Sequence, residues 1–190
     1  MSDAASAILP HRLNAEGHDF VFPVGDGRDL VLHSSGAVDW WLDGQRVRQA
    51  ALPHDVANTI LTSLGILDDF YSFVCRQLEH AQRKEPLNQM ELPEPLLGAH
   101  KPAWQADEKQ PRTEVVRQGP RFTANGVDVH LLDDGATWVR REGNAREALN
   151  IPSDAQKTIL SKTGNLIYAF SQAWREYEQL IRTNLGGSTS

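Results

Sequence analysis

The chain has 190 residues, of which 40% are hydrophobic and 23% are charged, and its formal net charge at pH 7 is −6. This composition is typical of a globular protein, and no apolar run approaches the roughly 20 residues that a membrane span requires. The N-terminal residues do not resemble a secretory signal, and the single cysteine, Cys75, cannot form an internal disulfide. We therefore expect a cytoplasmic protein without a membrane segment.

Residues 1–17 are expected to form a flexible N-terminus, and residues 18–83 predict four short strands followed by a helix. The strands are separated by compact loops, and each loop contains a glycine that supplies the positive φ of a tight hairpin. Three consecutive hairpins make an antiparallel meander. The predicted strands are FVFPV (20–24), DLVLH (29–33), AVDWWL (37–42) and QRVRQAA (45–51).

The helix of this first unit is expected to begin at Pro53, because the fixed φ of proline suits the first helical position. Asp55 then places a carboxylate in the positive first turn of the helix. Between residues 56 and 78, apolar side chains recur every three or four positions, which puts them along one stripe of a helix. Gly65 predicts a kink or a break within this segment.

Residues 84–112 hold five of the ten prolines and are predicted to be a linker. Residues 113–183 then repeat the order of four strands and a helix, with strands at 120–124, 127–132, 136–141 and 145–150. A flexible tail is expected at 184–190. Four apolar linker residues leave open whether the linker packs on one of the units: Leu92, Leu96, Leu97 and Trp104.

A tandem duplication accounts for the two units. When the sequence is shifted by 99 positions, residues 29–83 align with residues 128–182 without a gap, and 16 of the 55 pairs are identical. About three or four identities are expected by chance at ordinary residue frequencies. We therefore predict an α+β protein in which two tandem ββββα repeats pack as one pseudo-symmetric globule. A homodimer stays possible, because the repeats can satisfy each other or exchange with a second chain.

Side-chain alternation along the third strand of each repeat separates two faces of the predicted sheet. In the first repeat, residues 38, 40 and 42 form the more uniformly apolar face, which is expected to pack on the helix. The other face carries Trp41 in the first repeat and Trp138 with Arg140 in the second, with Val31, His33 and His130 on neighbouring strands. An open face of this kind suits base stacking beside phosphate contacts. The alternative is that the tryptophans are buried between the repeats.

The ββββα order, written twice and with each helix opened by proline as in ALPHDVANTILTSLGILDDFYSFV (51–74), resembles the PUR repeat. More loosely it is similar to the whirly proteins, a second family that binds single strands and has the same order of elements. The resemblance covers about residues 20–83 and 121–182. In PUR-repeat proteins two repeats intertwine into one globule and their sheets contact single-stranded DNA or RNA, so the resemblance implies this arrangement and function here.

The charge departs from the pattern of that family. PUR repeats usually carry basic and aromatic residues on their strands, whereas residues 18–83 contain nine acidic and five basic residues, and residues 113–182 contain nine of each. Because nucleic-acid affinity depends on neutralising phosphates, any binding is predicted to use a local basic patch. The alternative is that these arginines are ordinary solvated surface. The predicted nucleic-acid-binding residues are Trp41, Trp138, Arg140, Arg141, Arg146 and Arg121.

Sequence motifs of catalysis are not found. The seven histidines are scattered, and the sequence holds no HxH or HExxH pattern, no glycine-rich phosphate loop and no GxSxG. We expect no enzymatic activity, no metal and no cofactor. Two functions remain. The fold resemblance favours a single-stranded nucleic-acid-binding protein, whereas the acidic first repeat and the apolar linker favour a protein-interaction or adaptor module.

Overall fold

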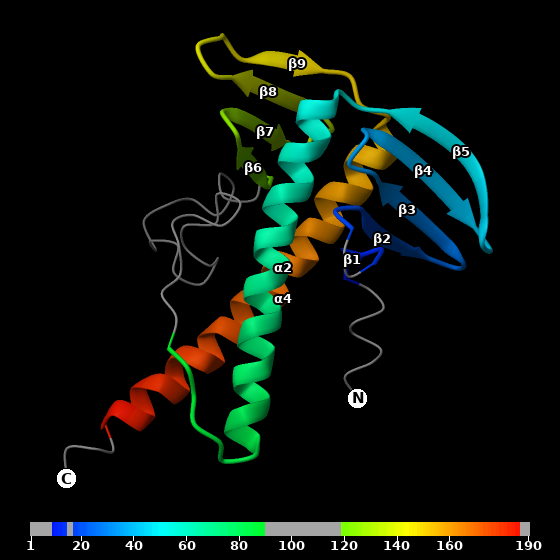
Figure 1. Cartoon of the computed structure of the whole chain (residues 1–190). Helices are drawn as coiled ribbons and strands as arrows, with labels where there is room; N and C mark the ends of the chain where they lie inside the picture. The colour runs from blue at the N-terminus through cyan, green and yellow to red at the C-terminus, as the bar shows by residue number, and fades with distance from the viewer. Residues whose placement is uncertain (1–8, 15–16, 90–118, 187–190) are drawn as a thin grey trace.

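Two antiparallel sheets and two long helices make up the described part of the chain, so the predicted α+β class is confirmed (Figure 1). The computed structural model describes residues 9–14, 17–89 and 119–186. Consecutive strands are neighbours in both sheets. The first sheet comprises β1 (His11–Arg12), β2 (Phe20–Gly25), β3 (Arg28–Leu32), β4 (Ala37–Leu42) and β5 (Gln45–Ala51), and the second comprises β6 (Arg121–Ala124), β7 (Val127–Leu131), β8 (Thr137–Arg141) and β9 (Glu147–Leu149). The helices are α2 (His54–Gln82) and α4 (Ser153–Gly186).

An Asp-Gly or Asn-Gly pair forms a tight turn in each sheet. In the β4–β5 turn, Asp43 and Gly44 have φ values of 50° and 80°, and in the β6–β7 turn Asn125 and Gly126 have φ values of 52° and 77°. A two-residue turn with both central residues in the left-handed region matches the right-handed twist of the strands that it joins. These local sequences therefore fix one hairpin in each meander.

Each helix covers part of the sheet that the other half of the chain forms. Helix α2 lies against β6 and β7 of the second sheet, helix α4 lies against β2 of the first sheet, and the two helices pack on each other (Figure 1). A single hydrophobic core results, because the buried apolar side chains of both halves meet around the helix pair. Its fully buried members include Phe20, Phe22, Leu30, Ile60, Leu64, Phe122, Val129, Leu131 and Ile159.

The elements of the two halves keep the spacing that the sequence alignment predicts. Strands β3 and β7, at residues 28–32 and 127–131, are 99 positions apart, as are His54 and Ser153, the first residues of the helices. None of the helices in the described ranges is both long enough and apolar enough to cross a membrane.

The N-terminal segment differs from the prediction, because part of residues 1–17 is ordered as β1. This strand pairs with β2 and gives the first sheet a fifth strand, where four were expected. The side chain of Arg12 then reaches helix α2, where it donates to the carbonyl of Gly65 at 3.1 Å and pairs with Asp69 at 3.0 Å. A strand of two residues is too short to leave an alternating pattern in the sequence.

Helix α4 runs further than expected, and neither helix breaks at its interior glycine. Helix α2 passes through Gly65, and α4 passes through Gly164 and continues to Gly186, into the expected tail at 184–190. An interior glycine costs a helix only about 1 kcal/mol relative to alanine, which burial of the helix face offsets. The first linker residues are held by the helices, since the backbone N–H of Asn88 donates to Oε1 of Gln77 at 2.7 Å. The apolar linker residues Leu92, Leu96, Leu97 and Trp104 lie outside the described residues.

Candidate functional site

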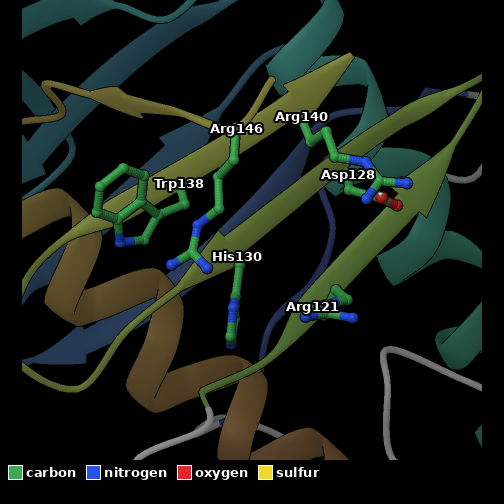
Figure 2. Close-up of a pocket in the computed structure, with 6 residues that line it drawn as sticks. All are labelled: Arg121, Asp128, His130, Trp138, Arg140 and Arg146. Carbon is green, nitrogen blue, oxygen red and sulfur yellow. Dashed lines mark ion pairs between the residues drawn. The ribbon is translucent and has the colours of Figure 1, made fainter. Parts of the chain in front are cut away.

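A pocket lies on the outer face of the second sheet, opposite the helices (Figure 2). The burial of the β7 residues distinguishes the two faces of this sheet. The odd-numbered residues are buried in the core, and the even-numbered residues are half-buried on the outer face. The pocket has a volume of about 180 Å³. The six residues that line it are Arg121, Asp128, His130, Trp138, Arg140 and Arg146. All of them except Asp128 and His130 belong to the predicted binding set.

Strand register brings these side chains together in two neighbouring rows. In the first row, Arg121 on β6 lies opposite His130 on β7, which lies opposite Trp138 on β8. In the second row, Asp128 on β7 lies opposite Arg140 on β8. Side chains that face each other across antiparallel strands have Cβ atoms about 5 Å apart, so the rows form one continuous surface.

The pocket combines a stacked aromatic ring with arginines that keep part of their hydrogen-bonding capacity. The guanidinium of Arg146 lies over the ring of Trp138, 4.4 Å from the ring centroid. Nε of Arg140 lies 3.9 Å from the carboxylate of Asp128, and the side chain of Arg140 is 67% exposed. Within the described residues Arg121 has no ion pair. Arg146 was expected within the last strand of the repeat and lies just before β9.

His130 and Asp128 are the pocket residues that the sequence did not select. Nε2 of His130 donates to the carbonyl of Gly119 at 3.1 Å, which fixes the ring tautomer. Burial lowers the pKa of His130, and the positive charge of Arg121 lowers it further. Alternation places both residues on the outer face of β7, and this was the only sequence signal for them, because a single histidine or aspartate on a strand matches no binding motif.

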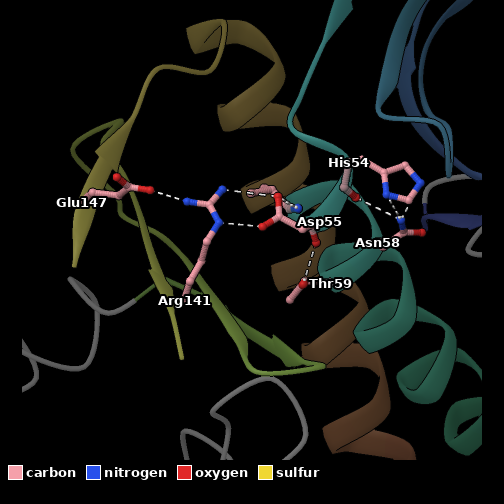
Figure 3. Close-up of polar contacts among 7 residues, drawn as sticks. His54, Asp55, Asn58, Thr59, Arg141 and Glu147 are labelled. Atoms are coloured by element: carbon pink, nitrogen blue, oxygen red, sulfur yellow. Dashed lines mark hydrogen bonds and ion pairs between the residues drawn. The ribbon is translucent and has the colours of Figure 1, made fainter. Parts of the chain in front are cut away.

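Arg141 is separated from the pocket, although it follows Arg140 directly. Its side chain points to the helix side of β8, where Nε donates to Oδ2 of Asp55 at 2.6 Å and Nη1 donates to Glu147 (Figure 3). The hydrogen bond from Arg141 lowers the pKa of Asp55. Asp55 lies in the first turn of α2, so the pair links the helix of the first half to the sheet of the second.

A second arginine–carboxylate contact joins the other helix to the sheet of the opposite half. Nη1 of Arg48 on β5 donates to Oδ2 of Asp154 at 2.8 Å, and Asp154 lies in the first turn of α4. The guanidinium of Arg48 also lies over the ring of Trp40, 4.1 Å from its centroid. The carboxylate that the sequence repeats at the start of each helix therefore binds an arginine on the sheet of the opposite half.

Trp41 lies on β4 of the first sheet and is not part of the pocket. Its partner on β5 is Arg46, after a bulge at which Val47 has no opposite residue. The indole N–H of Trp41 is buried and has no hydrogen-bond partner among the residues that the structure describes. The structure therefore divides the predicted set, since Trp41 and Arg141 lie at two places outside the pocket.

The outer side of the first sheet carries a histidine held between two carboxylates, one of which also lies 4.0 Å from Nη1 of Arg46. Nδ1 of His33 lies 2.8 Å from Oδ2 of Asp19, and Nε2 lies 2.9 Å from Oδ2 of Asp39, which is 4% exposed. Burial acts to lower the pKa of His33, but the hydrogen bonds to the two carboxylates outweigh it and raise the pKa. This cluster stabilises a charged imidazolium and offers no site for a phosphate.

Comparisons with protein-family models, curated proteins and solved structures find no match to this chain. In the ranges that the structure describes, no group of three or more histidine, cysteine, aspartate or glutamate side chains could hold a metal ion.

Proposed function

We propose that the chain binds single-stranded DNA or RNA through the outer face of its second sheet. The observation that carries this proposal is the convergence of three arginines and one tryptophan in a single pocket on an open sheet face. Trp138 with Arg146 provides a flat stacking surface, and stacking of a base on an aromatic ring or an arginine plane tolerates any base. Arg121 and Arg140 supply donors for the phosphate backbone.

The location of the pocket explains how a protein with a net charge of −6 can bind a polyanion. Long-range attraction is weak for such a chain, so binding depends on a local excess of positive charge. The second sheet has this excess at its outer face. The first sheet does not, because its corresponding side holds Asp19 and Asp39 around His33. Binding is therefore assigned to the second half alone, without Trp41 and Arg141.

We also propose that the fold arose by duplication. Duplication of a ββββα unit, related to the PUR repeat, is supported by the spacing of 99 positions between β3 and β7 and between the helix starts. It is also supported by the way in which each helix covers the sheet of the opposite half. A cytoplasmic location and a homodimeric state remain predictions from the sequence.

Fluorescence anisotropy with labelled single-stranded DNA and RNA, at low and at physiological salt, tests the function, with duplex DNA as the comparison. We expect a salt-dependent preference for single strands that weakens in Trp138→Ala and in Arg140→Glu. Arg28→Glu is the matched control, because Arg28 is an exposed arginine on a strand of the first sheet. Equal binding of duplex, or an equal loss in the control, would contradict the proposal.

A protein-interaction module is the second candidate, and one observation favours it. Three large apolar side chains of the first sheet are exposed, Val24 at 38%, Leu42 at 41% and Val47 at 60%, in the half of the chain that has an acidic excess. Exposed apolar residues flanked by charge are typical of protein contact surfaces. This function predicts that oligonucleotides do not bind even at low salt, and that Val47→Lys removes the partner whereas Trp138→Ala does not.

A further inference from the structure

The charge balance of the pocket favours an anion with more than one negative charge. Three arginines line the pocket together with a single carboxylate, Asp128. That carboxylate already accepts a hydrogen bond from the hydroxyl of Thr123 at 2.7 Å and lies 3.9 Å from Nε of Arg140. Arg121 and Arg146 have no carboxylate partner within the described residues. The pocket therefore holds two more positive than negative charges.

His130 responds to the same excess of positive charge. Burial and the charge of Arg121 lower its pKa, and Arg146 adds to the effect, while the hydrogen bond to the Gly119 carbonyl opposes the shift without reversing it. The ring is therefore neutral at pH 7, and the arginines alone carry the positive charge of the pocket. A bound anion would relieve the repulsion among these groups.

The dimensions of the pocket limit what it can hold. The lining residues come from β6, β7 and β8 and from the residue position just before β9. Neighbouring strands are about 4.8 Å apart, so β6 to β8 span roughly 10 Å. A volume of about 180 Å³ accommodates a phosphate group and part of an adjoining base. One phosphate with part of its base fills this volume, and the rest of a bound strand would lie outside the pocket.

We infer that the pocket recognises the terminal phosphate monoester of a single strand, with the adjoining base stacked against Trp138 and Arg146. This inference rests on the proposed function. A terminal monoester carries about −1.5 to −2 charges at pH 7, whereas each internal diester carries one, so the monoester matches the excess of two positive charges. Arg121 is assigned as the main phosphate ligand, because its guanidinium is not engaged in an ion pair or a ring contact within the described residues.

The test compares four oligonucleotides of one sequence by competition in fluorescence anisotropy: with a 5′-phosphate, with a 3′-phosphate, with both ends unphosphorylated, and as an unphosphorylated duplex. At physiological salt we expect one of the two phosphorylated single strands to bind roughly tenfold more tightly than the unphosphorylated strand, the gain that additional charge-assisted hydrogen bonds supply. Arg121→Gln should abolish this gain, so that the phosphorylated and unphosphorylated single strands bind the variant with equal affinity. Arg28→Gln, on the first sheet, should preserve the gain.

The results distinguish failure of the terminal-phosphate inference from failure of the proposed function. Equal affinity for phosphorylated and unphosphorylated single strands would overturn the terminal-phosphate inference and leave the proposed function intact. Absence of binding to every single strand would overturn both. Persistence of the tenfold gain in Arg121→Gln would overturn the assignment of this arginine as the phosphate ligand. Because Arg121 is exposed, its substitution should leave the unfolding temperature unchanged, which circular dichroism can check.

Discussion

Arg140 and Arg141 are adjacent in β8, and their side chains lie on opposite faces of the sheet. Arg140 points into the pocket and is 67% exposed, with Asp128 as a distant partner at 3.9 Å. Arg141 points towards α2, where it is 33% exposed and bonds to Asp55 and Glu147. Replacing each in turn by glutamine should therefore separate nucleic-acid binding from stability.

The expected magnitudes follow from these environments. Exposed ion pairs contribute about 0–1 kcal/mol to stability, and hydrogen bonds to charged groups contribute about 1.5–3 kcal/mol. The contacts of Arg141 lie between these cases, so Arg141→Gln should lower the free energy of unfolding by ~1–2 kcal/mol. For a chain of this size that corresponds to a decrease in Tm of roughly 2–8 °C. Arg140→Gln should change the free energy of unfolding by less than about 0.5 kcal/mol.

Thermal unfolding followed by circular dichroism measures the first effect, and oligonucleotide anisotropy well below Tm measures the second. We expect Arg140→Gln to bind more weakly with an unchanged Tm, and Arg141→Gln to bind normally with a lower Tm. The reasoning would be refuted by an Arg141→Gln protein that keeps its Tm and loses affinity, because the two arginines would then share one face of the sheet.

Two further predictions concern the first half of the chain. The pKa of His33 is raised, so its stabilisation is complete below its unfolded pKa of about 6.5 and is lost as the pH rises through the folded value. Urea unfolding between pH 6 and 9 should show this loss in the native protein, and His33→Asn should flatten it. Gly36→Ala should destabilise by ~1–3 kcal/mol, since φ is 96° and a Cβ would lie 2.5 Å from the Leu52 carbonyl oxygen. Gly135→Ala, with a φ of 91° and no atom within 4 Å, should cost less in the same assay.

The sequence allowed prediction of the elements that depend on neighbouring residues. Asp-Gly and Asn-Gly pairs indicated the hairpins, and the helix start after Pro53 was predicted to within one residue. The strand at His11–Arg12 could not be predicted, because two residues carry no periodicity. The continuation of α2 through Gly65 depends on burial of the helix, which a local signal does not report.

The sequence predicted which face of the sheet carries the site residues, but it did not predict their contacts with the other half of the chain. Alternation placed Trp138 and Arg140 on one face of a strand, and four of the six predicted residues line one pocket. Nothing in the local sequence indicated that α2 packs on the second sheet, which brings Asp55 to Arg141. That contact depends on the tertiary arrangement of the two halves. His130 was placed on the correct face, but a single histidine gives no reason to select it.

The salt dependence of single-strand binding tests the central claim most directly. Each neutralised phosphate of a single strand adds about −0.7 to the slope of log Kobs against log salt concentration. If Arg121 and Arg140 each neutralise one phosphate, the native protein should give a slope of about −1.4, and Arg140→Gln a slope closer to −0.7. No measurable binding at 50 mM salt, or a slope that Arg140→Gln leaves unchanged, would contradict the assignment of nucleic-acid binding to this face.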